Sequence, residues 1–502
     1  MPKVSGTLNY DAKILCLHID GINKLLTLAF NSKITFRSFN PLNEKNILRN
    51  RIMSKTIKLT KGYDIKLVGA ADKKIVDAAT PKTIAVQPTD FRYKRFKVLV
   101  EPGAEVKAGS PLMYDKEHPD VKITAPHSGE VVEVRRGEKR VLEAIIILAD
   151  KQNQFEDFGS ANPSALSSEQ VREKMLNSGV WSLLRQRPFN MIPSPQTAPK
   201  SIFISAFDSA PLAPSIDLIV EGEAEAFQAG IEALKKLTAG IIHLNIHATE
   251  TKSPVFLHAK GVQINKISGP HPAGNPGVQI HHIDPIKKGD TVWVVNPQEV
   301  IIIGRLFLTG KYDSRRVVAT TGSEFTTKQY YRTWTGANVS ELTSGKLTAA
   351  KNRVISGNVL TGTKIGPDGH LGFFDNQLTA IPEGDDMEFF GWLLPSYPRP
   401  DISKSFPWAF QKNREFAVNT NTHGEQRAFV VTGQYEKVLP MDILPTYLLK
   451  SIMYKDIDEM EQLGIYEVAE EDFALCEFVC TSKIPVQKIV REGLDFIYAE
   501  EQ

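Results

Sequence analysis

The residues best equipped for chemistry in this chain are arginines, histidines and cysteines that gather in a few short segments. Residues 181–189, WSLLRQRPF, set Arg185 and Arg187 beside two aromatic side chains. Such a combination can hold a planar or anionic ligand by stacking and by charge. The alternative is a structural aromatic residue with solvated arginines. Arg187 and Phe189 are the ligand-contact candidates of this segment.

Residues 269–285, GPHPAGNPGVQIHHIDP, are the densest run of glycine, proline and histidine. Backbone amides freed by glycines can cradle an anion. The run matches no phosphate-binding motif, so a rigid structural loop is the alternative. His271 is the candidate that this loop offers. His281 and His282 would point in opposite directions in an extended segment and would chelate poorly.

The sequence gives little support for a metal site. Cys476 and Cys480 would share one face of a helix, but a zinc or iron–sulfur site usually needs four ligands, and Cys16 is the only other cysteine. We expect two buried free thiols. His243 and His247 alternate with apolar residues, which favours a hydrogen-bonded strand end over a metal-binding face. We assign no metal ligand and no catalytic residue.

The composition is that of a globular chain with roughly three or four domains, since 42% of the 502 residues are hydrophobic and 24% are charged. Residues 1–52 hold 8 basic and 3 acidic residues, a net charge of +5, and the remainder holds 52 and 55, a net charge of −3. A weakly acidic body argues against nucleic acid as a partner. The sparse cysteines favour a reducing compartment.

Several elements must position these residues. Residues 102–134 alternate glycines, prolines and short apolar strands as barrel-sandwich carriers of biotin or lipoate do, but Lys116 and Lys122 lie at the wrong offsets for a carrier lysine. Residues from about 200 onward predict a βαβ unit. The expected strands are 202–207, 241–247, 262–267, 291–295, 299–308, 316–320 and 353–355, and the expected helices are 222–238, 446–454, 456–462 and 486–498.

The first 52 residues show no sustained period and no capped element, and the alternating strand pattern begins after Met53. We interpret residues 1–52 as an upstream over-translation, with a poorly ordered natural tail as the alternative. N-terminal mass spectrometry of the native protein distinguishes the two. No apolar run approaches the roughly 18–20 residues that span a bilayer.

The C-terminal strings closely resemble one family. GQYEKVLPMDILPTYLLK (433–450) and LGIYEVAEEDFALCEFVC (463–480) are similar to the NqrA family, which is one of the subunits of the bacterial Na+-translocating NADH:quinone oxidoreductase. Further strings match the family in the same order, from Met53 to nearly the end: KITAPHSGEVV (122–132), RPFNMIP (187–193), HPAGNPGVQIHHIDP (271–285) and RVISGNVLTG (353–362).

The resemblance implies a peripheral subunit on the cytoplasmic face of the bacterial inner membrane. Its complex passes electrons from NADH to a quinone and drives Na+ outward. The implied partners are the other five subunits, especially the membrane subunits, and quinone. NADH, flavins and iron–sulfur centres would belong to those subunits, so this chain would bind no cofactor and would be inactive alone. Arg187, Phe189 and His271 are the expected quinone contacts.

The family is also similar in domain order to the flavin subunits of respiratory complex I and the Rnf complex. Those bind FMN with a Gly-Gly-Ala-Gly-Phe-Pro-type loop, whereas residues 181–189 here contain no glycine. Residues 205–208, SAFD, stand where the flavin subunits carry an Asn-x-x-Glu-type segment. The alternative function, a soluble flavin-binding NADH dehydrogenase subunit, conflicts with both departures.

We therefore expect an α+β multidomain fold. Its parts would be a probable non-native extension (1–52), a barrel-sandwich hybrid domain (53–150), a Rossmann-like α/β domain (151–310), a small β-grasp module of the SLBB type (311–363), and an irregular, then helical, C-terminal region (364–502).

Overall fold

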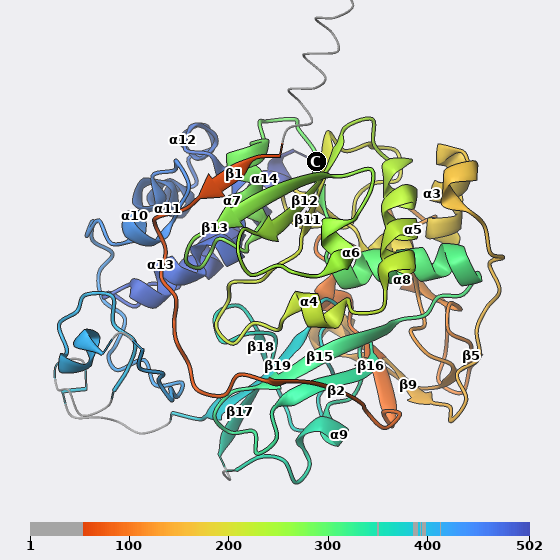
Figure 1. Ribbon diagram of the computed structural model, residues 1–502, viewed down its shortest axis with the longest axis horizontal. Helices are drawn as coiled ribbons and strands as arrows, with labels where there is room; N and C mark the ends of the chain where they lie inside the picture. Colours follow the sequence, from red (N-terminus) through yellow and green to blue (C-terminus); the bar gives the residue numbers. More distant parts are fainter. Residues whose placement is uncertain are drawn as a thin grey trace, which may run out of the picture. The chain divides into compact units, whose positions relative to one another are not determined.

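The computed structural model describes residues 54–348, 351–384, 390–391, 393, 398–411 and 413–501. The predictions about residues 1–52 and Cys16 lie outside this part of the chain. The expected α+β multidomain fold is confirmed: the described residues form a sandwich of two small sheets, an α/β region, a further mixed sheet and a helical C-terminal region (Figure 1).

A six-stranded sheet forms the α/β region. All neighbouring strands are parallel except β10, which runs antiparallel to β14 at one edge. The strand order is β1 (Thr56–Lys58), β13 (Gln263–Ser268), β12 (Ile241–His247), β11 (Ser201–Ser205), β14 (Val292–Val294) and β10 (Arg185–Arg187). The sequence placed the opening strand in the sandwich, but β1 joins this sheet instead. The prediction failed because a three-residue strand carries no information about its partner.

Helices cover both faces of this sheet, because successive side chains of a strand point to opposite faces. Ile202 and Ile204 of β11 lie in the core shared with α5 (Ala224–Lys235) and α8 (Pro297–Thr309). Phe203 between them lies in the core shared with α7 (Pro276–Ile283) and the C-terminal helices. The short helices α4 (Ile216–Ile219) and α6 (Pro254–Leu257) complete the region.

The predicted strand at residues 299–308 is wrong, since this segment is helix α8. A continuous apolar run does not separate a buried helix from a buried strand. The signals that decide are at its ends: Pro297 occupies the first turn and Gly310 closes the helix in a left-handed conformation, with φ of 73°. His281 and His282 are likewise helical, on α7, and not extended.

The barrel-sandwich fold is confirmed for the region that precedes residue 150. Its two sheets have the orders β3-β9-β8-β5 and β4-β6-β7. Lys116 follows β6 and Lys122 begins β7, where its Nζ donates to Asn177 Oδ1 at 3.3 Å. The strands are β3 (Thr83–Val86), β4 (Phe96–Val98), β5 (Glu105–Val106), β6 (Pro111–Asp115), β7 (Lys122–Thr124), β8 (Gly129–Arg136) and β9 (Leu142–Ala149). Helix α3 (Ser168–Asn177) follows, with a capping box at Ser167 and Gln170.

A second six-stranded sheet forms the SLBB-like module. Its order is β18 (Thr363–Ile365), β17 (Asn352–Ser356), β19 (Gln377–Pro382), β15 (Arg315–Thr321), β16 (Gln329–Trp334) and β2 (Asp72–Asp77), with the short helix α9 (Ser340–Thr343) beside it. The C-terminal region (364–502) therefore does not begin as wholly irregular structure, as the sequence predicted, because β19 lies between β17 and β15. The edge strand β2 comes from the segment that the sequence assigned to the sandwich.

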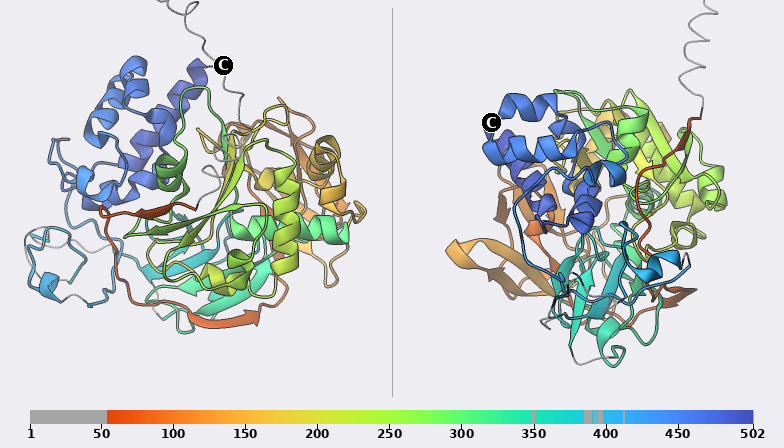
Figure 2. Two further views of the ribbon diagram at one scale, coloured as in Figure 1. Left: turned by 45° about the horizontal axis from the view of Figure 1, so that its top comes forward. Right: turned by 90° about the vertical axis from the view of Figure 1, so that its left-hand side faces the viewer.

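The C-terminal region is helical as expected and packs, together with α7, on the face of the α/β sheet that carries Phe203 (Figure 2). Its helices are α10 (Tyr435–Val438), α11 (Pro445–Tyr454), α12 (Ile457–Gln462), α13 (Ala474–Val479) and α14 (Val486–Glu500). A short 3-10 helix, η7 (Glu470–Phe473), precedes α13 and turns toward the α/β region.

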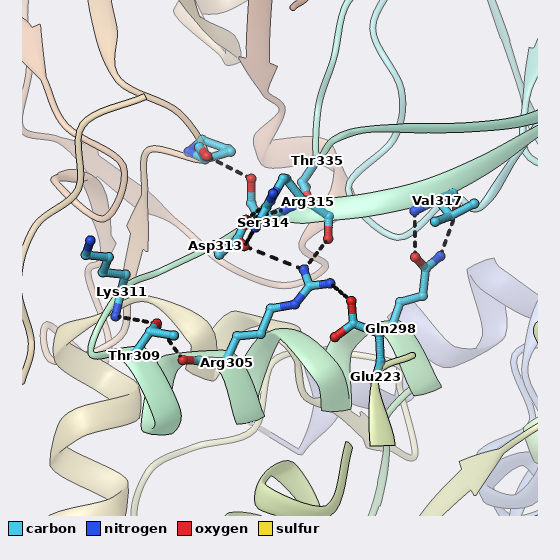
Figure 3. Close-up of polar contacts among 11 residues, drawn as sticks. Glu223, Gln298, Arg305, Thr309, Lys311, Asp313, Ser314, Arg315, Val317 and Thr335 are labelled. Atoms are coloured by element: carbon cyan, nitrogen blue, oxygen red, sulfur yellow. Dashed lines mark hydrogen bonds and ion pairs between the residues drawn. The ribbon is translucent and has the colours of Figure 1, made fainter. Parts of the chain in front are cut away.

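A polar junction joins α8 to the SLBB-like module (Figure 3). The Gln298 side chain exchanges two hydrogen bonds with the backbone of Val317, at 2.9 and 2.7 Å. Arg305 pairs with Glu223 and donates to the carbonyl of Arg315 at 3.0 Å. The hydroxyl of Ser314 donates to the carbonyl of Pro126 in the sandwich at 2.7 Å. The linker between α8 and β15 therefore contacts all three regions.

Helices α5 and α8 approach each other closely at two glycines. A Cβ at Gly304 would lie 1.7 Å from the carbonyl oxygen of Ala226, and one at Gly230 would lie 2.1 Å from that of Val300. We expect Gly304→Ala to lower the free energy of unfolding by about 1–3 kcal/mol, although alanine is intrinsically about 1 kcal/mol better in a helix. Urea denaturation measures this. Gly366→Ala is the control, because its Cβ meets no atom within 4 Å; equal stability of both variants would contradict the close packing.

Candidate functional site

A cavity of about 170 Å³ opens at the carboxyl ends of β11 and β14. From β11 the chain adds β12 and β13 on one side, then returns to place β14 on the other. Ligands of open α/β sheets bind at such a switch point, outside the carboxyl ends of the strands. Three regions of the chain line the cavity: the α/β region (Arg185, Asp208, His271, Asn275, Asn296), the SLBB-like module (Asn358, Phe374, Asp375) and the C-terminal region (Glu471).

Arg185 supplies the positive charge of the cavity wall. It begins β10, and its Nη2 donates to Asn296 Oδ1 at 3.2 Å. The guanidinium carbon lies 5.1 Å from the ring centroid of Phe374, a cation–π distance. Burial lowers the pKa of Arg185, but an arginine keeps its proton in proteins. The group therefore presents a fixed cation with donors left over for a ligand.

His271 supplies a neutral hydrogen-bond donor. The amide of Gly274 donates to Ser209 Oγ at 2.8 Å, so the hydroxyl hydrogen is free to point at His271 Nδ1, 3.0 Å away. This arrangement makes Nδ1 an acceptor and places the ring hydrogen on Nε2. Burial lowers the pKa of His271 to about 4, against a weaker opposing effect of the Glu471 charge. At neutral pH the ring is an uncharged donor.

Glu471 forms the C-terminal wall and is held by an arginine of the edge strand. Arg187 Nη2 lies 2.5 Å from Glu471 Oε1, and the arginine side chain is 3% exposed. Burial works to raise the pKa of Glu471, but the charges of Arg187 and Arg185 outweigh it, so the pKa lies below its ordinary value. The carboxylate stays ionised.

A second ion pair supports the part of the wall that the SLBB-like module contributes. Arg316 of β15 and Glu299 of α8 lie 2.8 Å apart, and both side chains are 0% exposed. Arg316 Nη1 also donates to the carbonyl of Asp375 at 3.1 Å. Burial raises the pKa of Asp375, against the charges of Arg316 and Arg185, and Ser356 Oγ donates to its Oδ2 at 2.5 Å. The loop that carries Phe374 and Asp375 is thereby tied to α8.

The structure brings two of the three candidate residues to one site and separates the third. His271 lines the cavity, and Arg187 reaches it through Glu471. Phe189 lies outside the cavity lining, in an aromatic cluster with its ring centroid 5.3 Å from that of Tyr498 and 6.1 Å from that of Tyr93.

Sequence reasoning did not place Asp375, Asn296 or Glu471 at this site. Glu471 and Asp375 come from segments far from the βαβ unit, and no local pattern connects them to it. A usable signal existed for Asn296, because an Asn-Pro pair often starts a helix. Asn275-Pro276 and Asn296-Pro297 begin α7 and α8 here, and both pairs lie at the cavity.

The remaining candidates have structural partners. Cys476 and Cys480 are buried, as expected, and Tyr435 Oη donates to Cys480 Sγ at 3.0 Å. His243 Nδ1 lies 3.3 Å from Asn265 Nδ2, and His281 Nδ1 lies 2.8 Å from Glu467 Oε2. Across the described ranges, no group of three or more histidine, cysteine and acidic side chains is arranged to hold a metal ion.

The segment that stands in place of a flavin loop is packed into the core. Residues 180–183 form a 3-10 helix, η4 (Val180–Leu183), and Trp181 Nε1 donates to the carbonyl of Pro193 at 2.9 Å. The ring centroids of Trp181 and Trp293 lie 5.4 Å apart, edge to face. Bulky side chains thus fill this position, and the absence of a bound flavin stays a prediction.

Comparisons with known proteins match this chain along most of its length. Family models match the NqrA N-terminal barrel-sandwich hybrid domain at residues 57–150, the NqrA second alpha/beta domain at 166–312 and the NQRA C-terminal domain at 317–366. The NqrA subunit of the Na(+)-translocating NADH-quinone reductase from Serratia proteamaculans is 41% identical over 449 residues, covering 88% of this chain and 100% of the relative. The chain belongs to the NqrA family.

Two further NqrA relatives match this chain to a similar extent. The NqrA subunit from Yersinia pestis bv. Antiqua is 40% identical and that from Neisseria meningitidis serogroup B is 38% identical, each over 88% of this chain and 100% of the relative. A solved NAD+-reducing [NiFe]-hydrogenase chain overlaps 67% of this chain and 62% of its own at a TM-score of 0.37 and 11% identity, too loosely to support an argument.

None of the described helices is both long and apolar enough to cross a membrane.

An aromatic cluster connects the sandwich to the cavity wall. Phe91 of the sandwich lies 4.8 Å from Phe373 between ring centroids, and Phe373 lies 5.0 Å from Phe374. The amide of Phe373 donates to Asp90 Oδ2 at 2.9 Å. Burial, with a smaller effect of the Asp375 charge, raises the pKa of Asp90 to about 7.

Asp90→Asn tests this contact. The wild-type carboxyl stays protonated in the folded chain to about pH 7 but ionises near 3.8 when unfolded, so it destabilises the fold progressively as pH rises between those values. Asparagine keeps an acceptor for Phe373 without the charge. We expect the variant to be more stable than wild type by about 1–2 kcal/mol at pH 8, with the difference shrinking toward pH 4. Urea denaturation across this range measures it, and exposed Asp72→Asn is the control; a pH-independent difference would contradict the shift.

Proposed function

We propose that this chain acts as the peripheral NqrA component of a Na+-translocating NADH:quinone reductase. In this complex it would lie on the cytoplasmic face of the bacterial inner membrane, with the other five subunits as partners. The observation that carries the proposal is the match at about 40% identity to relatives of that name over their full length. The chain would serve quinone reduction and assembly of the complex without a redox centre of its own.

Within that role, we propose that the cavity at the carboxyl edge of the sheet takes the quinone headgroup. A quinone presents two carbonyl acceptors, and the cavity wall offers two donors of suitable kind, the neutral imidazole of His271 and the charged Arg185. Phe374 adds an aromatic face beside Arg185. A volume of about 170 Å³ suits a single ring with small substituents.

The two donors would favour the reduced forms of the headgroup. Reduction of a quinone adds two electrons and two protons, and the negative charge develops on the carbonyl oxygens. A fixed guanidinium stabilises that charge, because a charge-assisted hydrogen bond is about twice as strong as a neutral one. The electrons would come from partner subunits and the protons from water. Arg187 would act at a distance, by holding Glu471 in place, and Phe189 would make no headgroup contact.

The alternative function, a soluble flavin-binding NADH dehydrogenase subunit, finds no support in the comparisons. The bulky side chains of Trp181, Leu183 and Leu184 are buried where the flavin loop would approach the phosphate. An absorbance spectrum of the purified chain with a stoichiometric flavin band would favour this alternative over ours.

The cavity proposal is tested with Arg185→Met and His271→Phe in the assembled complex. Each variant removes one donor and keeps the size of the side chain, so we expect the apparent KM for quinone to rise about tenfold or more. NADH oxidation with an artificial acceptor should be unchanged, because the electron-entry side is untouched. Arg332→Met is the matched control, since Arg332 pairs with Asp77 at the surface. If a variant that combines Arg185→Met with His271→Phe reduces quinone with a wild-type KM, the cavity is not the quinone site.

A further inference from the structure

Helix α11 is apolar on two faces. Of its ten residues, PTYLLKSIMY, only Lys450 is charged. Its inner face buries Leu448, Leu449 and Ile452, and Ile452 packs against α14 so closely that a Cβ on Gly493 would lie 2.7 Å from it. An ordinary surface helix has one apolar face toward the core and a polar face toward water. The packing on α14 therefore explains the apolar residues on the inner face of α11 but not those on its outer face.

Several apolar side chains on the outer face of α11 are exposed in the described part of the chain. Tyr454 is 85% exposed, Met453 56% and Tyr447 51%, and Leu444, just before the helix, is 53% exposed. Tyr447 and Tyr454 are seven residues apart, so they lie on one stripe of the helix with Lys450 between them. This spacing is that of a helix seam that packs against a second helix.

The apolar surface extends beyond the helix. The Nζ of Lys450 lies 5.8 Å from the ring centroid of Phe429, so the segment that continues into the exposed Val430 and Val431 passes near the tip of this side chain. We call these residues together the α11 patch: Val430, Val431, Leu444, Tyr447, Met453 and Tyr454. Single exposed apolar residues elsewhere, such as Leu257 on α6, are normal for a soluble surface, whereas a contiguous patch indicates a partner.

We propose that the α11 patch docks an amphipathic helix of another subunit of the complex, an inference that rests on the proposed function. Six such side chains offer on the order of 500–800 Å² of apolar surface, close to what one partner buries in a stable protein interface. Tyrosine and methionine are enriched in interface cores, as in this patch. Lys450 at the seam requires an acidic side chain at the edge of the partner helix.

The charges around the patch favour a protein over a lipid surface. Helices that lie on anionic lipid carry several lysines and arginines along their polar edge. The basic residues here are Lys450 on α11 and Lys455 at its C-cap, and the chain then continues into α12, whose first turn holds Asp458 and Glu459, with Asp456 as its cap. These exposed carboxylates beside Tyr454 would be repelled by an anionic membrane but tolerated at the rim of a protein interface.

The test uses the whole complex, purified from co-expressed subunits through an affinity tag on a membrane subunit. The variant is Tyr447→Ser combined with Tyr454→Ser, and the matched control is Leu257→Ser, which removes a large apolar side chain that is 44% exposed and outside the patch. We expect the double variant to be retained with the complex at least about tenfold less than wild type, with the control retained fully. Thermal melting of the isolated chain verifies folding; if the double variant melts early, Tyr454→Ser alone is used.

Each outcome decides the proposal. Full retention of a folded patch variant overturns the docking surface and leaves the proposed function intact. Failure of the wild-type chain to be retained overturns the proposed function and the inference with it. Flotation of the isolated chain with vesicles of phosphatidylethanolamine and phosphatidylglycerol, lost in the patch variant, assigns the patch to lipid and overturns the proposal. Self-association lost in the same variant assigns it to a second copy and overturns the proposal equally.

Discussion

The ion pair between Arg187 and Glu471 is the contact on which the site depends. Arg187 is 3% exposed and cannot discharge by losing its proton, so its place in the edge strand β10 requires a carboxylate beside it. Glu471 meets that requirement from the C-terminal region, nearly 300 residues later in the chain. Removing one partner of such a pair costs about 3–5 kcal/mol, because it leaves a buried charge alone. Glu471 also lines the cavity, so the bond that docks the C-terminal helices sets one wall of the site. Arg316 and Glu299 form a second buried ion pair, which ties the SLBB-like module to α8. The cavity therefore exists because three regions are fixed around buried charges.

The chain keeps the shapes of two cofactor-binding folds, and the segments expected to present a cofactor in each make contacts within the chain. In the sandwich, the nearest candidate for a carrier lysine, Lys122, donates to Asn177 at the end of α3. In the α/β region, Trp181 fills the place where a flavin loop would pass, and it packs on Trp293 under the sheet. Of these two residues, Trp181 is fully buried, whereas the hydrogen bond of Lys122 lies at the surface. The chemistry that remains lies at the switch point of the sheet, where His271 and Arg185 offer hydrogen-bond donors and no group that accepts electrons. We propose that such a site recognises an electron acceptor and leaves electron delivery to a partner subunit.

Local patterns in the sequence were sufficient for the elements that are regular and self-contained. The βαβ unit, the capping box of α3 and the helices α11, α12 and α14 follow from periodicity and end signals. Helix α8 was predicted as a strand, because a fully buried helix shows no polar face, although Pro297 and Gly310 mark its ends. Membership of the sheets could not be predicted for β1, β2 and β19, since their partners lie far away in the sequence.

Prediction of the site has the same limit. His271 and Arg187 stand in unusual local sequences, whereas Glu471 and Asp375 become site residues only through long-range ion pairs and hydrogen bonds. Phe189 shared the local signal of Arg187, but a left-handed backbone with φ of 76° turns it into an aromatic cluster instead.

We propose that this subunit contacts the quinone headgroup through the cavity of Arg185 and His271. Photocrosslinking tests it most directly, with a quinone that carries a photoreactive group on its ring, applied to the purified, turning-over complex and followed by peptide mapping. The account predicts labelled peptides from residues 269–285 and from the segment that carries Arg185, with labelling suppressed by excess unlabelled quinone. Labelling confined to other subunits, or labelling of this chain that excess quinone does not suppress, would contradict it.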